Sequence, residues 1–263
     1  NSEILNELLK ISYMRSLRSG EIFLCESSTV IMKEFFEKHF IDSEWIKQYF
    51  NLAVYDYTML SELSGQEKFI SLGFKADEDI NNYSLASMKK TLSGKKLRLF
   101  IEASLSQKTF DSVKKVFGKP FINVLSEMEL ISPSTVISNP TYLSKGEAEI
   151  LINKNATVQI SVSDYINFGD KKTDFDEMIF SDLNIILGTG YTGSSIFSEM
   201  KILSSLVSKH SLNSESLLKM VTLNPAQVFG VSNLTGSIER NKSADMIILS
   251  MSDVRNALTI PEI

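Results

Sequence analysis

The sequence predicts an α/β fold, a (β/α)8 TIM-type barrel that lacks its first strand. Short apolar runs of strand character alternate with longer amphipathic helical patterns along most of the 263 residues. Most of the runs are largely apolar, which is typical of parallel strands that are buried on both faces. An open doubly wound sheet is the other common architecture with alternating strands and helices, but about seven strand–helix units favour the barrel.

The expected strands are five to eight residues long and rich in Val, Ile, Leu and Phe. LRLFIEA, for example, alternates apolar and polar residues and then becomes continuously apolar. They are predicted at 21–25, 52–57, 69–74, 97–103, 134–139, 157–163, 184–189 and 243–250.

The expected helices carry apolar residues at helical spacing between these strands. Gly20 ends the first of them, and Ser43 is an N-cap candidate. Asn224–Pro225 marks a helix boundary, because the residue before proline is disfavoured in the α conformation. The helices are predicted at 3–18, 29–40, 43–50, 84–94, 108–117, 145–153, 172–181, 194–209 and 214–228.

Composition excludes several classes of site. One Cys excludes internal disulfides and Cys-rich metal centres and fits a reducing, cytoplasmic compartment. Two His, at 39 and 210, exclude any site built from three imidazoles of this chain, and both are expected to be structural. The net charge of −5 and the short apolar runs give no reason to expect nucleic-acid or membrane partners. Cys25 is expected to be an inert core thiol.

Seven segments carry a specific order of motifs. They are RSLRSGEIFLCES (15–27), FIEASLS (100–106), GKP (118–120), ISNPTYLS (137–144), LGTGYTGSSIFSEMK (187–201), LLKMVTLNPAQVFGV (217–231) and GSIERNKSADMIILS (236–250). In this order they resemble the amidohydrolase superfamily, in the branch that holds chlorohydrolases, guanine deaminases and adenosine-type deaminases. In the ERNKSAD turn, Asn241 stands where that branch has Gly, and Asn is the residue that best replaces Gly in a left-handed turn.

The resemblance implies a barrel over residues 1–232 and, over 233–263, a strand segment of a small β-sandwich. It also implies a zinc or iron ion at the C-terminal mouth of the barrel that activates a water molecule. The family's ligands are an H-x-H pair on strand 1, a His on each of strands 5 and 6, and an Asp on strand 8. Strand 1 is not in this sequence, which begins at Asn1, and further chain upstream or a tight oligomer is expected to cover the strand edges.

At the positions that can be compared, the family's metal ligands and catalytic acid are replaced. Glu102 and Asn139 stand where the two His are expected, Leu105 where a catalytic Glu is expected, and Gly190 where the Asp is expected. We therefore predict no catalytic residue, no metal ligand and no cofactor. The first hypothesis is a non-catalytic binding or partner subunit that works as a homo-oligomer or with an additional chain.

Two further hypotheses stay open. The first is an active hydrolase on C–N or C–Cl bonds of a small cyclic substrate, with a site completed elsewhere or built around Glu102, for which Glu26 and Asp56 are the conceivable oxygen ligands. The second is an anion-binding module that uses the Gly-rich loop 188–195 before a helix. Beside Glu102 and Asn139, the candidate ligand-binding residues are Gly188, Thr189, Gly190, Gly193 and Ser194.

Overall fold

Seven parallel strands, hydrogen-bonded in chain order from β1 to β7, form the sheet of the computed structural model. The model describes residues 2–28, 50–54, 70–75, 81–93, 97–102, 106–168, 174–191, 195–208 and 212–249. The strands are β1 (Leu24–Ser28), β2 (Phe50–Val54), β3 (Ile70–Lys75), β4 (Arg98–Glu102), β5 (Thr135–Ser138), β6 (Thr157–Ile160) and β7 (Asn184–Leu187).

This order confirms the predicted α/β barrel with an incomplete sheet. Each strand pairs in parallel with the next one, for example Glu102 of β4 with Ser138 of β5. β1 and β7 form the two edges of the described sheet. A parallel sheet in strictly sequential order is the arrangement of a (β/α) barrel, whereas a doubly wound sheet reverses its strand order at a switch point.

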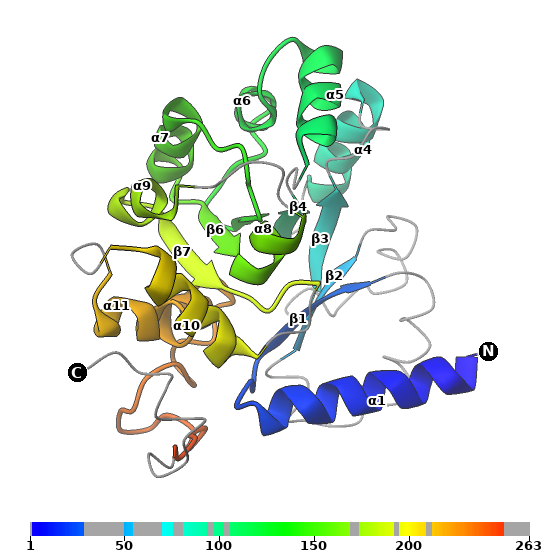
Figure 1. The fold of residues 1–263 in the computed structure, drawn as a ribbon. Helices are drawn as coiled ribbons and strands as arrows, with labels where there is room; N and C mark the ends of the chain where they lie inside the picture. Colours follow the sequence, from blue (N-terminus) through cyan, green and yellow to red (C-terminus); the bar gives the residue numbers. More distant parts are fainter. Residues whose placement is uncertain are drawn as a thin grey trace.

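Helices follow most of the strands, and α4 to α7 lie along the outer side of the curved sheet, while α1 runs along the lower right of the molecule (Figure 1). None of the described helices is both long enough and apolar enough to cross a membrane. They are α1 (Ser2–Arg18), α4 (Asn82–Leu92), α5 (Gln107–Phe117), α6 (Phe121–Glu127), α7 (Lys145–Asn153), α8 (Val162–Phe168), α9 (Phe175–Phe180), α10 (Ile196–Leu206), α11 (Ser214–Lys219) and α12 (Leu223–Val228).

Two hydrophobic clusters lie on the two faces of the sheet. The larger cluster packs the outward side chains of the strands, such as Ile101 and Ile137, against the surrounding helices. The smaller cluster joins the inward side chains Val136 and Ile186 to Phe229, which follows α12. The segment around α12 therefore packs against the concave face of the sheet.

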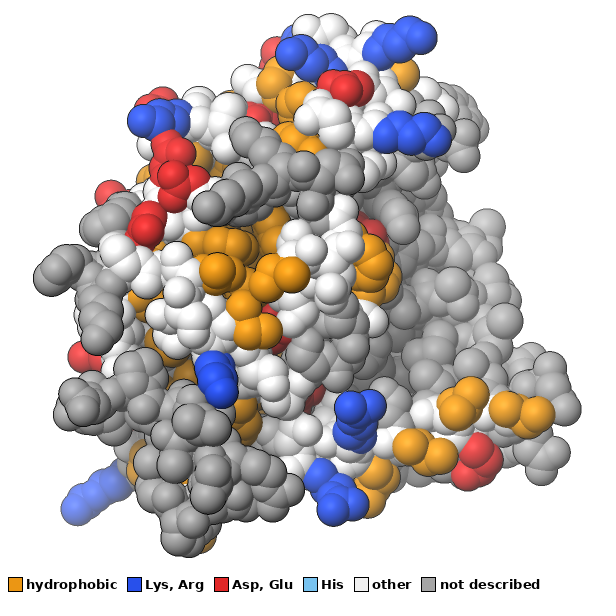
Figure 2. All heavy atoms as spheres, in the orientation of Figure 1, with side chains coloured by type: hydrophobic (Ala, Val, Ile, Leu, Met, Phe, Trp, Pro, Cys, Tyr) orange, Lys and Arg blue, Asp and Glu red, His pale blue; other side chains and the backbone are white. Residues whose placement is uncertain are grey.

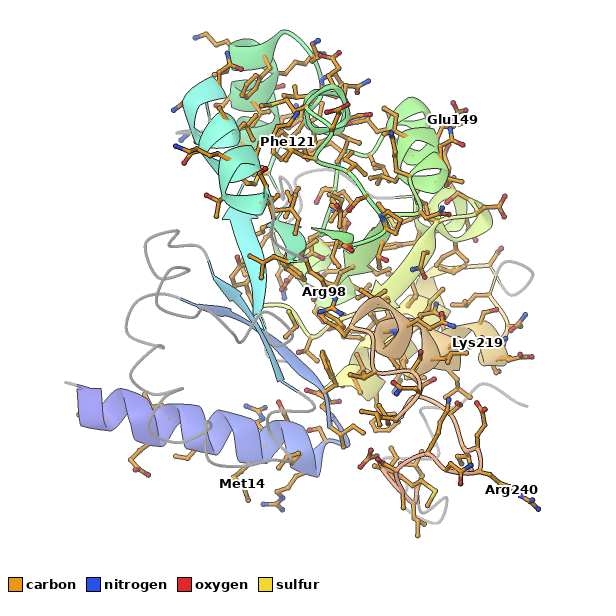
Figure 3. All side chains as sticks on the ribbon, turned by 180° about the vertical axis from the view of Figure 1, so that it is seen from behind. Met14, Arg98, Phe121, Glu149, Lys219 and Arg240 are labelled. Atoms are coloured by element: carbon orange, nitrogen blue, oxygen red, sulfur yellow. The ribbon has the colours of Figure 1, made fainter. Side chains whose placement is uncertain are left out.

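Arg98 fixes α12 to this inner face. Its guanidinium group donates hydrogen bonds to the carbonyl oxygens of Val228 (2.8 Å) and Phe229 (2.6 Å), and it lies 5.6 Å from the Phe229 ring centroid. Figure 3 shows Arg98 between the strands and the C-terminal part of the chain. Because Arg98 begins β4 and Glu102 ends it, α12 lies at the end of the barrel opposite to Glu102.

The structure corrects three predicted elements. The strand predicted over 157–163 ends at Ile160, and the polar residues that follow begin α8 instead. The helix predicted over 214–228 is two helices, α11 and α12, separated by a turn, with Pro225 in the first turn of α12. Residues 243–249, predicted as a strand, have no regular secondary structure, since no strand of the described sheet pairs with them.

Smaller differences follow from turn chemistry. α6 was not predicted, because it spans only seven residues and begins after Pro120 without a side-chain cap. Asn241 has φ 68°, which confirms the predicted left-handed turn. The helices predicted at 29–40 and 43–50, with His39 and Ser43, lie outside the described residues except for Phe50, which begins β2 instead of ending a helix. His210 also lies outside the described residues. The domain boundary at residue 232 stays a prediction.

The surface of α1 is partly apolar. Ile4, Leu8, Ile11 and Met14 are each more than half exposed. Figure 2 shows hydrophobic side chains along this helix at the lower right of the molecule. Their spacing matches the amphipathic pattern that predicted the helix.

Candidate functional site

The C-terminal ends of β4 to β7 bring together the residues that the sequence analysis singled out. Glu102 ends β4, Asn139 follows β5, and Gly188 to Gly190 follow β7. Because parallel strands in one sheet end at the same edge, these residues share the mouth of the barrel. Glu102 and Asn139 are both buried, with 8% and 2% of their surface exposed.

Asn139 links the loops that follow β5 and β6. Its backbone is left-handed, with φ 49°, a conformation that Asn tolerates better than most residues. Its side-chain Oδ1 accepts a hydrogen bond from the Ser161 backbone N–H at 2.7 Å. Its Nδ2 donates to Asp164 Oδ2 at 3.2 Å. Both ends of the amide are thus engaged by the protein.

Asp164, in the first turn of α8, is the fully buried carboxylate of this mouth. Besides Asn139, it accepts hydrogen bonds from the Tyr191 backbone N–H, at 3.1 Å to Oδ1 and 3.0 Å to Oδ2. Hydrogen bonds from N–H groups are what a buried carboxylate requires. Asp164 therefore connects three strand-end loops.

Buried contacts hold α8, and with it Asp164, in place. Tyr165 packs edge-on against Phe175, with ring centroids 5.5 Å apart. Burial raises the pKa of Tyr165 well above its ordinary value, with a further contribution from Asp164, so the phenol is neutral. The Ser163 backbone N–H donates to the buried carboxylate of Glu199 on α10 at 3.1 Å, and the Ser163 hydroxyl donates to the same group.

Glu102 is the second carboxylate of the mouth, and it is covered by the β7 loop. The Tyr191 hydroxyl donates a hydrogen bond to Glu102 Oε1. Tyr191 thus contacts both acids, one through its backbone and the other through its side chain. The hydroxyl of Ser161 is buried and has no hydrogen-bond partner within the described part of the chain.

Gly190 lies against Asp164, and Gly188 lies against the Gln159 side chain, with Thr189 between them in the sequence. Gly193 and Ser194 lie outside the described residues. Ser195 caps α10, and its hydroxyl accepts from the Ser198 N–H at 3.3 Å. The Ile196 N–H at the start of α10 donates to the Glu21 carboxylate at 3.0 Å. Carboxylates thus lie at both ends of the 188–195 loop. This geometry does not favour an anion site at the 188–195 loop. The anion site stays a prediction, and isothermal titration of the protein with phosphate tests it.

Replacing Glu21 by glutamine is expected to make protein stability less sensitive to pH. Burial raises the pKa of the Glu21 carboxyl above its ordinary 4.5, against smaller opposing hydrogen bonds from Ile196 and Ser16. A raised folded-state pKa means that the group's contribution is fully present below 4.5 and is lost as pH rises through the folded pKa. The measurement is the melting temperature of both proteins from about pH 3 to about pH 7, a range that includes ordinary carboxyl titration and extends above it.

The difference in melting temperature, wild type minus Glu21→Gln, should be largest at the acid end and fall toward neutral pH. Glu215 provides the control, because it is exposed and the Lys219 hydrogen bond lowers its pKa. Glu215→Gln should therefore give a difference that changes in the opposite direction. A Glu21 difference that rises with pH contradicts the assignment.

Sequence reasoning missed Asp164, Tyr191 and Glu21. Asp164 was hidden in a run predicted as strand, and the one available signal was a polar Ser-Asp pair after a short apolar run. Cys25 is half-buried and packs against the inner cluster, which agrees in part with the expected core thiol. Leu105 and Asp56 lie outside the described residues, and the Glu26 side chain is not described.

Curated proteins with related sequences are deaminases. The 5'-deoxyadenosine deaminase of Methanosphaera stadtmanae is 25% identical over 189 residues, which are 66% of this chain and 44% of that protein. The 5-methylthioadenosine/S-adenosylhomocysteine deaminase of Pyrococcus furiosus is 24% identical over 212 residues, 72% of this chain and 50% of that protein. The chain thus spans about half the length of these relatives.

Solved structures share the fold at low sequence identity. The guanine deaminase from Bradyrhizobium japonicum superposes with a TM-score of 0.77 at 14% identity, covering 93% of this chain and 63% of that one. A zinc-bound adenosine deaminase from Xanthomonas campestris gives 0.75 at 12% identity, covering 97% and 64%. The model of the Amidohydrolase family matches residues 107–260, more than half of the sequence. Fold, motif order and this match agree, and the chain belongs to the amidohydrolase family.

Proposed function

We propose that this chain is a non-hydrolytic member of the amidohydrolase family, which acts as a binding or partner subunit through the mouth of its barrel. The observation that carries the proposal is the state of Glu102, Asn139 and Gly190, where the family resemblance implies metal ligands. The first two side chains are hydrogen-bonded within the protein, and the third is absent.

The donor set does not fit the zinc or iron centre of the family. Neutral imidazoles bind such ions with a free nitrogen lone pair, which an amide does not offer. The Asn139 oxygen already accepts from Ser161, and its NH2 group donates to Asp164. Among the described residues, no three or more His, Cys, Asp or Glu side chains are grouped so that they could hold one ion. These contacts support a mouth held together by hydrogen bonds instead of a metal.

The protein purified from cells grown with added zinc and iron is expected to carry far less than one metal ion per chain. The physical reason is that binding would have to break the Asn139 and Tyr191 hydrogen bonds to the two acids. Elemental analysis by mass spectrometry after gel filtration checks this result.

The control is the melting temperature before and after dialysis against a chelator, which should not change. A stoichiometric zinc, iron or manganese ion whose removal lowers the melting temperature contradicts the proposal. Metal that the chelator removes without changing the melting temperature is bound adventitiously at the protein surface, and this outcome supports the proposal.

The second candidate function is hydrolysis of C–N bonds, with a site completed outside the described residues. It is favoured by the names of the curated relatives, which are deaminases. Ammonia release from 5'-deoxyadenosine, coupled to a spectrophotometric assay, distinguishes the two functions. If ammonia release rises in proportion to protein concentration and is abolished in Glu102→Gln, the chain is a C–N hydrolase and the proposed non-hydrolytic function is wrong.

The partner prediction is also retained as a proposal. β1 and β7 are edges of the described sheet, and unpaired strand edges favour pairing with another chain. We propose that a second copy or an additional chain covers them. Size-exclusion chromatography with light scattering tests this proposal, and a stable monomer of only these 263 residues contradicts it.

A further inference from the structure

Position 190 has no room for a side chain. Gly190 has φ +60°, in the left-handed region. A Cβ atom built on its backbone would overlap Asp164 Oδ2 and Ser161 Oγ, and it would lie 2.5 Å from Asp164 Cγ. The space that a side chain of residue 190 would fill is therefore filled mainly by the carboxyl group of Asp164 and in part by the hydroxyl of Ser161, both from the segment that follows β6.

The contacts of Asp164 tie it to the chain on both sides of this space. Tyr191, the neighbour of Gly190, donates its backbone N–H to both carboxylate oxygens. Asn139, from the β5 loop, donates its side-chain NH2 to Oδ2. A fully buried charge with these donors is positioned by the surrounding loops and in turn fixes their conformation.

We propose that Asp164 is a relocated carboxylate, which supplies from α8 the acidic group that position 190 on the β7 loop lacks. Only one of the two positions can carry a side chain of this size. Asp164 is a positioning residue: it holds the backbone of Tyr191 so that the Tyr191 hydroxyl reaches Glu102. This arrangement goes beyond the proposed function, because it holds whether the mouth binds a ligand or hydrolyses one.

The first test measures the overlap. Gly118 is the matched control, because it is also left-handed, with φ +70°, but a Cβ there meets nothing within 4 Å. Gly118→Ala should lower the melting temperature by about 2–4 °C, through backbone strain alone. Gly190→Ala should lower it at least twice as much, and the excess should fall by at least half in the Asp164→Ala background, where only the overlap with Ser161 Oγ remains.

Equal losses for Gly190→Ala and Gly118→Ala would overturn the proposal, because no overlap would then exist. So would an excess that persists at full size without the Asp164 carboxyl. Both comparisons use only melting temperature, so their outcome is independent of metal content and of any activity.

The second test moves the carboxylate. Asp and Asn both tolerate a left-handed backbone, so both can be placed at position 190. Asp164→Ala should lower the melting temperature, and adding Gly190→Asp should recover at least half of that loss. Adding Gly190→Asn, which has the same shape without the charge, should recover clearly less. Gly190→Asp in the wild-type background should be the least stable variant of the set, because two carboxylates would share one space.

Strictly additive losses, or equal recovery by Asp and Asn, overturn the proposal. If Asp164→Ala alone yields no soluble protein, the two double variants Asp164→Ala/Gly190→Asp and Asp164→Ala/Gly190→Asn are compared by soluble yield and by cooperative melting. Soluble, cooperatively melting protein from the Asp variant but not from the Asn variant supports the relocated carboxylate. Failure of both double variants overturns the proposal.

Discussion

Ile101→Ala is expected to lower the free energy of unfolding by about 2–5 kcal/mol, the range found for truncation of fully buried aliphatic side chains. Ile101 is completely buried in β4 and belongs to the large cluster between sheet and helices. Truncation removes three carbon atoms and leaves a cavity that the flanking strands β3 and β5 cannot close without breaking their pairing. Urea denaturation, followed by circular dichroism, measures the loss.

Ile238→Ala is the matched control, because the same atoms are removed from a side chain that is 87% exposed. Its free energy of unfolding should stay within about 0.5 kcal/mol of wild type. Similar losses at both positions would mean that the β4 side chain is not in the core as described. The denaturant slope should be unchanged in both variants, since the surface exposed on unfolding hardly differs.

Arg98→Met should lower the free energy of unfolding by about 2–4 kcal/mol, because hydrogen bonds from a charged donor to buried carbonyl groups are among the stronger ones. Two such bonds, to Val228 and Phe229, hold the end of α12 against the inner face of the sheet. Burial lowers the pKa of Arg98, and a smaller effect of Cys25 opposes this, but the guanidinium stays protonated at neutral pH. Methionine keeps most of the apolar stem and donates no hydrogen bond.

Two comparisons make this prediction specific. Arg240→Met changes an exposed side chain of the same kind and should alter stability by no more than about 0.5 kcal/mol. Hydrogen exchange should accelerate most in the amides of residues 223–229 in Arg98→Met. Uniform acceleration over the whole sheet, with α12 no more affected than β5, would show that Arg98 does not anchor this helix.

Much of the fold could be predicted because buried parallel strands have a strong local pattern. Each of the seven strands of the described sheet overlaps a predicted strand, in the order that a barrel requires, although the first was predicted at 21–25 and lies at Leu24–Ser28. Where the prediction and the structure differ, the local apolar pattern favours one conformation and the long-range hydrogen-bond partners favour another. Residues 243–249 have the apolar pattern of a strand, but a strand exists only where a partner offers hydrogen bonds, and the described sheet offers none there.

The candidate site could be predicted only in part. Motif order located Glu102, Asn139 and Gly190, and the structure places them at one mouth. Asp164 could not be found in this way, because its role depends on α8 turning back over the strand ends after Ile160. Tyr191 was equally hidden, since a residue after a Gly-rich turn gives no sign of which acid it will contact.

The sequence by itself indicated the family, the strand order and the residues at two positions where the resemblance implies His, because periodicity, motif order and residue identity are properties of the chain alone. Only the tertiary structure decided which contacts the residues at these positions make. Hydrogen bonds between residues 25 and 27 positions apart, such as those that the Asp164 side chain accepts from the Asn139 side chain and the Tyr191 backbone, depend on distances that no local pattern encodes. The space at Gly190 is likewise a property of packing, since it is filled by a residue from another loop.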